Sequence, residues 1–356
     1  MSRPAKPLAP SSPSEAGLYR VAIVGAGTLK GKELSDLLPE TSFPTAEVKL
    51  LDDDESLGQL EAVGDEVTFV QSIAPDSFDH VDFAFFASRT DFTRNHWRMA
   101  QQAGSMIVDL SYGLEDVPGA RVRSPWLERE LGRQFIPELE PAPVVTAHPA
   151  ATVLALLLVR AQKAAPVRSA VATVFEPASE RGRVGMDELH EQTVNLLSFQ
   201  ELPKQVFDAQ VAFNLLARYG QQSKPPLEEA ERRILSHFRQ IAGPGTPVPS
   251  LMLVQAPIFH AHVFSLYIEL KEAPALGDFS QALAGEHVQL TRMADESPSN
   301  VNAAGQGDAL LWVRADAQQE NGVWIWGAAD NLRLLSMNAV DCAQQMAAAR
   351  PRGKLQ

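Results

Sequence analysis

Short apolar runs alternate with helical segments through the first half of the chain. Each run ends in glycine or a polar residue, and the runs cover residues 18–24, 47–51, 66–70, 83–87 and 106–109. Runs that are apolar throughout are typical of strands buried on both faces. Between them, residues 32–38 and 93–104 space their apolar positions as helices do. The pattern predicts an α/β domain built on a doubly wound parallel sheet.

The second half begins with a short apolar strand, a proline turn and an apolar helix within residues 144–160. We expect the helix to start between Ala150 and Thr152 and to be buried, because nearly every face of it is apolar. Strand patterns follow at residues 167–175, 251–255, 261–270 and 309–315, and amphipathic helices at residues 185–199 and 226–242. This succession predicts an α+β substrate and dimerisation domain with a largely antiparallel sheet.

These patterns define the predicted domains. Residues 18–147 form the first domain and residues 148–329 the second. The last apolar helix, within residues 330–349, needs another apolar face to cover it, so we assign it to the first domain. Residues 1–17 and 350–356 are predicted tails, the first of them disordered because it is rich in proline, serine and alanine.

A glycine-rich loop, GAGTLKG at residues 25–31, lies between the first strand and the first helix. In this context glycines let the backbone approach a pyrophosphate, and the helix start supplies N–H donors. The first domain is therefore expected to be Rossmann-like, with a dinucleotide bound at this loop. The alternative is that the loop and the acidic turn after the next strand bind no ligand. Asp52 ends the next strand, where a carboxylate would accept the ribose hydroxyl of NAD and repel the 2′-phosphate of NADP. The candidate cofactor contacts in this part are Gly25, Gly27, Thr28, Gly31 and Asp52.

Composition removes several classes of function. The net charge of −13, without a basic patch, argues against binding to nucleic acid or to an anionic membrane. No apolar run approaches the roughly 18 residues of a membrane span. The single cysteine rules out an internal disulfide framework and fits a cytoplasmic protein.

The predicted helix start between Ala150 and Thr152 has the clearest chemical potential. Unpaired N–H groups and the positive end of the helix dipole point outward at such a turn. They lower the pKa of a cysteine and stabilise an oxyanion, which suits an acyl-transfer nucleophile. Alanine stands there instead. The turn is still expected to hold a small-molecule anion.

Several segments in register resemble the aspartate-semialdehyde dehydrogenase family, from about residue 19 to about residue 346. They are GAGTLKG, the proline turn, VFEPASERGRVGMDEL, AFNLLA, APIFHAHV and AADNLRLLSMNAV. Members of this family serve amino-acid biosynthesis and interconvert an acyl phosphate and a semialdehyde with NADP(H), through a cysteine thioester and a histidine acid/base. The resemblance implies the same two-domain fold and a homodimer.

This chain differs from the family at the functional positions. The Asn-Pro-Asn-Cys-Thr turn of the family resembles HPAAT here, which places Ala151 at the position of the nucleophile. Glu176 stands for the orienting glutamine, Gln255 and Glu115 stand for anion-binding arginines, and His262 matches the acid/base histidine. The chain therefore most resembles the Usg-type homologues, which keep the fold and lack the catalytic cysteine.

The cofactor contacts implied by the family are altered as well. Ser88, Ser111 and Asn331 match positions on the nicotinamide side. The Ser-Arg pair that binds the 2′-phosphate resembles DDE at residues 53–55. The resemblance therefore permits NAD as the cofactor and argues against NADP.

Other residues offer weaker alternatives. Cys342 lies among apolar positions of the last helix and is predicted to be a core residue. Thr152 has no evident base beside it, so helix N-capping is its expected role. Two histidines and a carboxylate match a metal site in residue type, and His260 and His262 would share one face of a strand. We nevertheless predict no metal, but a remnant pocket of hydrogen-bonded groups drawn from His148, Glu176, His260 and His262.

The sequence leads to one principal hypothesis and two alternatives. The principal hypothesis is a cytoplasmic, homodimeric protein similar to aspartate-semialdehyde dehydrogenase but without thioester dehydrogenase activity, because Ala151 cannot act as a nucleophile. The first alternative is an NAD-dependent oxidoreductase that uses His262 and Glu176 on another small substrate. The second is a non-catalytic binding or regulatory subunit.

Overall fold

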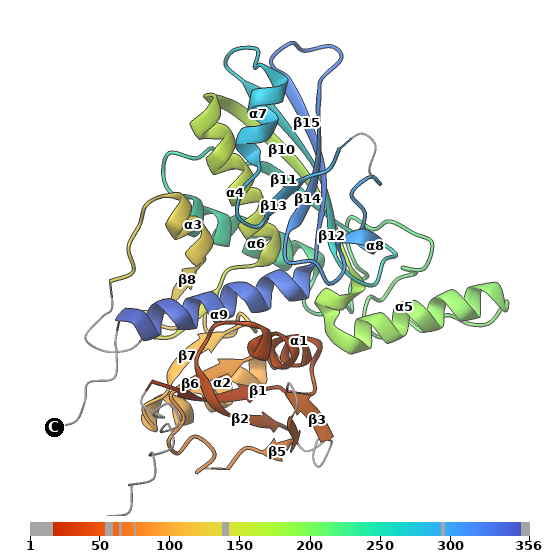
Figure 1. Cartoon of the computed structure of the whole chain (residues 1–356). Coiled ribbons are helices and arrows are strands. Elements are labelled where there is room, and N and C mark those ends of the chain that lie inside the picture. Colours follow the sequence, from red (N-terminus) through yellow and green to blue (C-terminus); the bar gives the residue numbers. More distant parts are fainter. Residues whose placement is uncertain are drawn as a thin grey trace, which may run out of the picture.

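The structure is a computed structural model, and it describes residues 17–53, 60–63, 66–74, 76–136, 142–292 and 296–349. Two large sheets, each with its own hydrophobic core, divide the molecule into a lower and an upper part (Figure 1). The elements up to residue 146 are β1 (Tyr19–Val24), α1 (Leu29–Leu37), η1 (Leu38–Glu40), β2 (Thr45–Asp52), β3 (Leu60–Val63), β4 (Glu66–Phe69), β5 (Gln71–Ser72), β6 (Phe83–Phe86), α2 (Thr90–Gln102), β7 (Met106–Asp109), β8 (Arg121–Arg123), α3 (Pro125–Glu130) and β9 (Val144–Thr146).

The first sheet has seven strands in the order β5-β2-β1-β6-β7-β9-β8, and every neighbouring pair is parallel. The chain moves outward in opposite directions from β1 to β2 and from β6 to β7. Right-handed crossovers therefore place α1 and α2 on opposite faces. The predicted doubly wound parallel sheet is confirmed. One predicted strand lies elsewhere, because β4 pairs antiparallel with β3 in a separate two-stranded sheet.

The last helix, α9 (Asn331–Ala349), crosses between the two parts and lies beside α1 (Figure 1). Its side chains Ala339, Val340, Cys342 and Ala343 are buried in the same core as β1 and β6. The apolar stripe of α9 thus has the covering surface that its pattern requires.

The upper part contains the rest of the chain. Its elements are α4 (Pro149–Ala164), β10 (Val167–Glu176), η3 (Ala178–Arg181), α5 (Gly182–Leu197), α6 (Leu227–Ala242), β11 (Ser250–Gln255), β12 (His262–Leu270), α7 (Leu276–Leu283), β13 (Val288–Leu290), α8 (Asn300–Ala303), β14 (Ala309–Ala315) and β15 (Gly322–Ala329). The prediction missed β15, which lies in the middle of the second sheet, as well as the shorter elements β3, β5, β8, β13, α3, α7, α8, η1 and η3.

The second sheet is mixed, with six strands in the order β11-β10-β12-β15-β14-β13. Its three central pairings are antiparallel, while β11 and β13 pair parallel to their neighbours. Helices α4, α6 and α7 cover one face. The other face carries exposed apolar side chains at Val171, Met252 and Trp312. Helix α5 extends away from the body (Figure 1). Its last residue, Leu197, is exposed.

Candidate functional site

A cleft of about 470 Å³ lies where the two parts meet, and residues from both parts line it. The first part contributes the glycine-rich loop and the ends of β6 and β7, and the second contributes the start of α4, the end of β10 and η3. The lining residues that carry the chemistry are Lys30, Ser88, Ser111, His148, Glu176, Glu180, Arg181 and Arg233. The carboxyl ends of parallel strands face this cleft, as they face ligand sites in doubly wound sheets.

The glycine-rich loop is shaped by close approaches within the chain. Gly25 has φ +89°, and a Cβ there would lie 2.5 Å from the backbone nitrogen of Ser88. A Cβ on Gly31 would lie 2.1 Å from the carbonyl oxygen of Gly25. Thr28 is the N-cap of α1, because its Oγ1 accepts a hydrogen bond from the N–H of Gly31 at 3.0 Å. The packing of the loop alone therefore requires glycine at positions 25 and 31.

Asp52 lies beneath this loop and is buried. One of its carboxylate oxygens accepts the N–H of Gly27 at 2.7 Å, and the other accepts the N–H of Asp53 at 2.9 Å. Asp53 forms an ion pair with Arg89 at 3.4 Å. The carboxylate of Asp52 thus holds the glycine loop in place, and its contact with a ribose stays a prediction.

Lys30 reaches from the first turn of α1 across the floor of the cleft. Its Nζ donates to the carbonyl oxygen of Leu110 at 2.9 Å and lies 4.4 Å from the centre of the Tyr112 ring. Burial lowers the pKa of this amine, against the opposing charges of Glu180 and Asp109. Ser111, at the same strand end, donates its hydroxyl to Asp109 at 2.6 Å. The sequence did not single out Lys30 as a functional residue.

Helix α4 begins at Pro149, and His148 is its N-cap. The Nδ1 of His148 accepts the N–H of Ala150 at 3.2 Å, and its carbonyl oxygen accepts the N–H of Thr152 at 2.9 Å. Ala151 is fully buried in the first turn. The predicted N-capping role of Thr152 is wrong: the helix starts three residues earlier, and its buried Oγ1 has no hydrogen-bond partner in the described part of the chain.

A chain of hydrogen bonds, buried at His148 and partly exposed at Glu115, supports the start of α4. The N–H of His148 donates to Nδ1 of His237 at 2.9 Å, so the proton of the His237 ring sits on Nε2. That Nε2–H donates to Glu115 at 2.9 Å, and Arg233 donates to the same oxygen at 2.7 Å. Burial acts to raise the pKa of Glu115, but the hydrogen bond from His237 and the charge of Arg233 outweigh it and lower the pKa.

Glu176 is buried at the end of β10, and its Oε2 lacks a hydrogen-bond partner among the described residues. Burial, followed by the charge of Glu180, raises its pKa to about 8, so the carboxyl is largely protonated at neutral pH. Its backbone oxygen accepts from the side-chain amide of Gln255 at 3.0 Å, and Gln255 accepts from the Tyr219 hydroxyl at 2.7 Å. Gln255 is therefore a buried structural amide beside the cleft.

His262 is the first residue of β12, and continuing the strand register places it opposite Glu176 on the same face of the sheet. The side chain is 2% exposed, and neither ring nitrogen has a hydrogen-bond partner among the described residues. Burial lowers its pKa, against the opposing charge of Glu180. His260 does not share this strand. Ala261 has φ +68°, which breaks the extended backbone between the two histidines, so their predicted common face is wrong.

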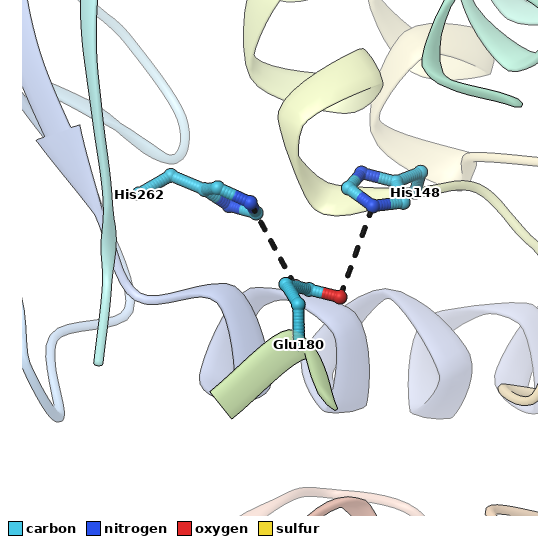
Figure 2. A group of neighbouring side chains, drawn as sticks. All are labelled: His148, Glu180 and His262. Atoms are coloured by element: carbon cyan, nitrogen blue, oxygen red, sulfur yellow. Dashed lines mark ion pairs between the residues drawn. The ribbon is translucent and has the colours of Figure 1, made fainter. Parts of the chain in front are cut away.

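Glu180 is the functional candidate that the sequence reasoning missed. It lies in the short helix η3, and its two oxygens lie 3.7 Å from Nε2 of His262 and 3.9 Å from Nε2 of His148 (Figure 2). Asn331, predicted as a cofactor contact, is buried and donates to Glu180 at 2.8 Å. The only available signal was a second glutamate four residues after Glu176 in EPASE. Nothing in its spacing distinguishes it from a surface charge.

The sole cysteine lies in the core of the first part. Cys342 is fully buried on α9, as predicted, and burial raises its pKa to about 12. Since the chain has no other cysteine, no thiol borders the cleft.

Known proteins match both halves of the chain. Residues 20–125 match the family described as "Semialdehyde dehydrogenase, NAD binding domain", and residues 158–334 match "Semialdehyde dehydrogenase, dimerisation domain". A USG-1 protein homolog of Azotobacter vinelandii is 32% identical over 333 residues, which is 91% of this chain and 96% of that protein. A USG-1 protein homolog of Pseudomonas aeruginosa is 31% identical over 323 residues, which is 90% of this chain and 95% of that protein.

Solved structures agree. A probable aspartate-semialdehyde dehydrogenase from Pseudomonas aeruginosa superposes with a TM-score of 0.80 at 28% identity, over 93% of this chain and 98% of that one. Aspartate semialdehyde dehydrogenase II of Vibrio cholerae has the same fold, with a TM-score of 0.82 at 22% identity over 93% of this chain and 98% of that one. By the sequence of both halves and by its fold, this chain belongs to the semialdehyde dehydrogenase family.

Proposed function

We propose that this protein is a cytoplasmic homodimer of the family that does not catalyse semialdehyde oxidation through a thioester. The position of its thiol carries the proposal. A thioester mechanism needs a reactive thiolate at the cleft, whereas Cys342 is buried in the core of the first part with a pKa of about 12. Ala151, in the first turn of α4, offers a methyl group at the position assigned to the nucleophile.

The anion-binding groups around this turn support the same proposal. The guanidinium of Arg233 is held by Glu115 at 2.7 Å and by Glu229 at 3.3 Å. Gln255, at the second position assigned to an arginine, is neutral and hydrogen-bonded to Tyr219. At these two places a carboxylate or phosphate substrate would therefore meet a guanidinium already paired with carboxylates and a neutral amide, and the cleft's further cations include Lys30 and Arg181. A small-molecule anion between Ala150 and Thr152 stays a prediction, and both of those N–H groups already donate to His148.

A direct assay tests the proposal. Purified protein is incubated with aspartate semialdehyde, phosphate and either NAD or NADP, and nicotinamide reduction is followed by absorbance. We expect no turnover above background. We expect the same of Ala151→Cys, because Gln255 and Glu115 would still occupy the two positions assigned to anion-binding arginines. Wild-type turnover at a thousandth of the ~10 s⁻¹ typical of enzymes would contradict the proposal.

Binding of a dinucleotide is a separate part of the proposal. The family domain over residues 20–125 and the helix start behind the glycine loop support binding, and the acidic pair Asp52 and Asp53 supports NAD over NADP. We expect NAD, and not NADP, to raise the melting temperature. A larger shift with NADP would overturn the preference, and no shift with either would favour a subunit without a cofactor.

A second candidate function is an oxidoreductase on another small substrate, with Glu176 and His262 as its polar groups. The supporting observation is the raised pKa of Glu176, which leaves a carboxylic acid able to donate a proton at neutral pH. An NAD-linked activity found by substrate screening would have to disappear in Glu176→Ala. An activity that survives this substitution would exclude the candidate.

The open face of the second sheet supports the homodimer. Val171 is 50% exposed, Met252 56% and Trp312 37%, and strand register places all three on the face opposite α4 and α6. These side chains are spread across the face from β11 to β14, and soluble monomers rarely leave large apolar surfaces uncovered. The family description of this half as a dimerisation domain agrees with this assignment.

A further inference from the structure

We propose that His148, Glu180 and His262 bind a divalent transition-metal ion, for which Zn²⁺ is the best match. Three separate elements bring the residues together: the start of α4, the short helix η3 and the first residue of β12. One candidate ligand atom from each lies within 4.8 Å of the other two. In Figure 2 the two imidazole rings reach toward the carboxylate from either side.

The donor set is that of a zinc site. Two imidazole nitrogens and one glutamate form the protein ligands of one class of catalytic zinc centres, with bonds of about 2.0–2.2 Å. Tetrahedral ligands at that range are about 3.4 Å apart. The separations of 3.7 Å from Oε1 of Glu180 to His262 and of 3.9 Å from Oε2 to His148 are too long for hydrogen bonds. With one ligand atom taken from each residue, the three atoms lie within 4.8 Å of one another, which is up to about 1.4 Å wider than in a filled site. We expect side-chain rotations on metal binding to close this difference.

The unpartnered ring of His262 points independently to a ligand. Buried polar groups are almost always hydrogen-bonded, because an unsatisfied one costs folding free energy. His262 is 2% exposed, and neither of its ring nitrogens has a partner in the described part of the chain. Its Nε2 faces Glu180 (Figure 2). A metal ion between the two groups would satisfy that nitrogen.

Asn331 supplies the outer support that metal ligands require. Its side-chain amide donates to Glu180 at 2.8 Å, and its oxygen accepts the N–H of Ala261, next to His262, at 3.1 Å. His148 and Glu180 line the cleft, so we expect the coordination position left open by the protein to face it. An ion held there by three protein ligands would polarise a carbonyl oxygen of a bound molecule. This inference is independent of the proposed lack of thioester chemistry.

Metal binding has a defined consequence for His148. Its Nδ1 accepts the N–H of Ala150 at 3.2 Å, which places the ring proton on Nε2 while the ion is absent. Coordination through Nε2 requires the proton to move to Nδ1 and this long hydrogen bond to break. The tautomer of His148 therefore reports occupancy without any enzymatic assay.

Calorimetry tests the site. The untagged full chain is stripped with a chelator and titrated with ZnCl2. We expect one ion per chain with a dissociation constant of about 1 µM or lower, and losses of at least ~100-fold in affinity for His262→Ala and for Glu180→Gln. His260→Ala is the matched control and should bind like the wild type, because Ala261 separates that histidine from the strand.

Magnetic resonance supplies a second readout. Two-bond proton–nitrogen correlation spectra should show His148 changing from the Nε2–H to the Nδ1–H form on addition of ZnCl2. Unchanged affinity in both ligand variants would overturn the proposal, since the ion would then sit on other side chains, and so would the absence of binding at 100 µM ZnCl2. If His262→Ala fails to fold by circular dichroism, the isosteric Glu180→Gln decides alone.

Discussion

Two acidic residues near the cleft, the half-buried Glu115 and the buried Glu176, differ in their surroundings. Glu115 accepts hydrogen bonds from His237 and Arg233, which hold its charge. Glu176 has no cation of that kind bonded to it in the described structure, and burial holds it protonated instead. Environment, rather than residue type, separates the roles of the two carboxyl groups.

The lowered pKa of Glu115 makes the stability of the protein depend on pH. Its stabilising contribution is fully present above the unfolded pKa of about 4.5 and is lost as the pH falls through the lower folded pKa. At pH 7 we expect Glu115→Gln to reduce the free energy of unfolding by about 1–3 kcal/mol. The deficit should shrink below pH 4.5, as followed by chemical denaturation across pH.

Asp116→Asn is the matched control for this prediction. Asp116 is 92% exposed and lies 3.7 Å from Arg94, so its charge should contribute within about 0.5 kcal/mol at either pH. A Glu115→Gln deficit that persists unchanged at pH 3 would show that the substitution acts through packing and not through the charge.

At the scale of the elements, the start of α4 shows what a single residue pattern can and cannot define. The run PAATVLALLLVR predicts a buried helix correctly, because almost every position is apolar. The boundary was misplaced because the capping group is an imidazole, whereas serine, threonine, aspartate and asparagine are the usual N-caps. The N-cap role was therefore predicted for Thr152, whereas His148 is the N-cap.

The capping assignment gives an opposite expectation for two threonines. Thr28 caps α1, so Thr28→Val should lower stability by about 1 kcal/mol. The Oγ1 of Thr152 is buried without a partner among the described residues, so Thr152→Val should be neutral or stabilising. Urea unfolding of both variants checks this pair. A loss of about 1 kcal/mol in Thr152→Val would restore the capping role.

The strands of the first sheet were predictable because burial on both faces leaves uninterrupted apolar runs. The central strand β15 was missed because GVWIWGAA is bounded by no turn signal at its end and leads directly into the last helix. The candidate site was partly predicted: His148, Glu176 and His262 do border one region. Glu180 could be identified only from the three-dimensional fold, because its neighbours His148 and His262 lie at the starts of α4 and β12, far from it in the sequence.

At the scale of the whole molecule, the uncovered face of the second sheet is the feature from which we infer the oligomeric state. We expect Met252→Asp, which puts a charge on this face at the edge strand β11, to shift the protein from dimer to monomer in sedimentation velocity. Phe69→Asp is the control, because Phe69 is 59% exposed on β4, in the small separate sheet. A monomeric wild type, or a dimeric Met252→Asp variant, would place the interface elsewhere or remove it.

None of the helices within the described residues is long and apolar enough to cross a membrane. Exposed apolar side chains also lie at the end of α5 and just beyond it, where Leu197 is 69% and Phe199 99% exposed.

The placement of α9 also bears on how the chain is made. The core around β1 includes side chains from Leu335 to Ala347, yet all of the second part is synthesised between β9 and this helix. Because the ribosome adds about 5–20 residues per second, the apolar surface of the first part under α9 stays uncovered for roughly 10–40 s during synthesis. The second part can finish folding first, which reverses the usual order of domains along a growing chain. We therefore expect premature termination just before α9 to impair folding of the first part, rather than of the truncated second part.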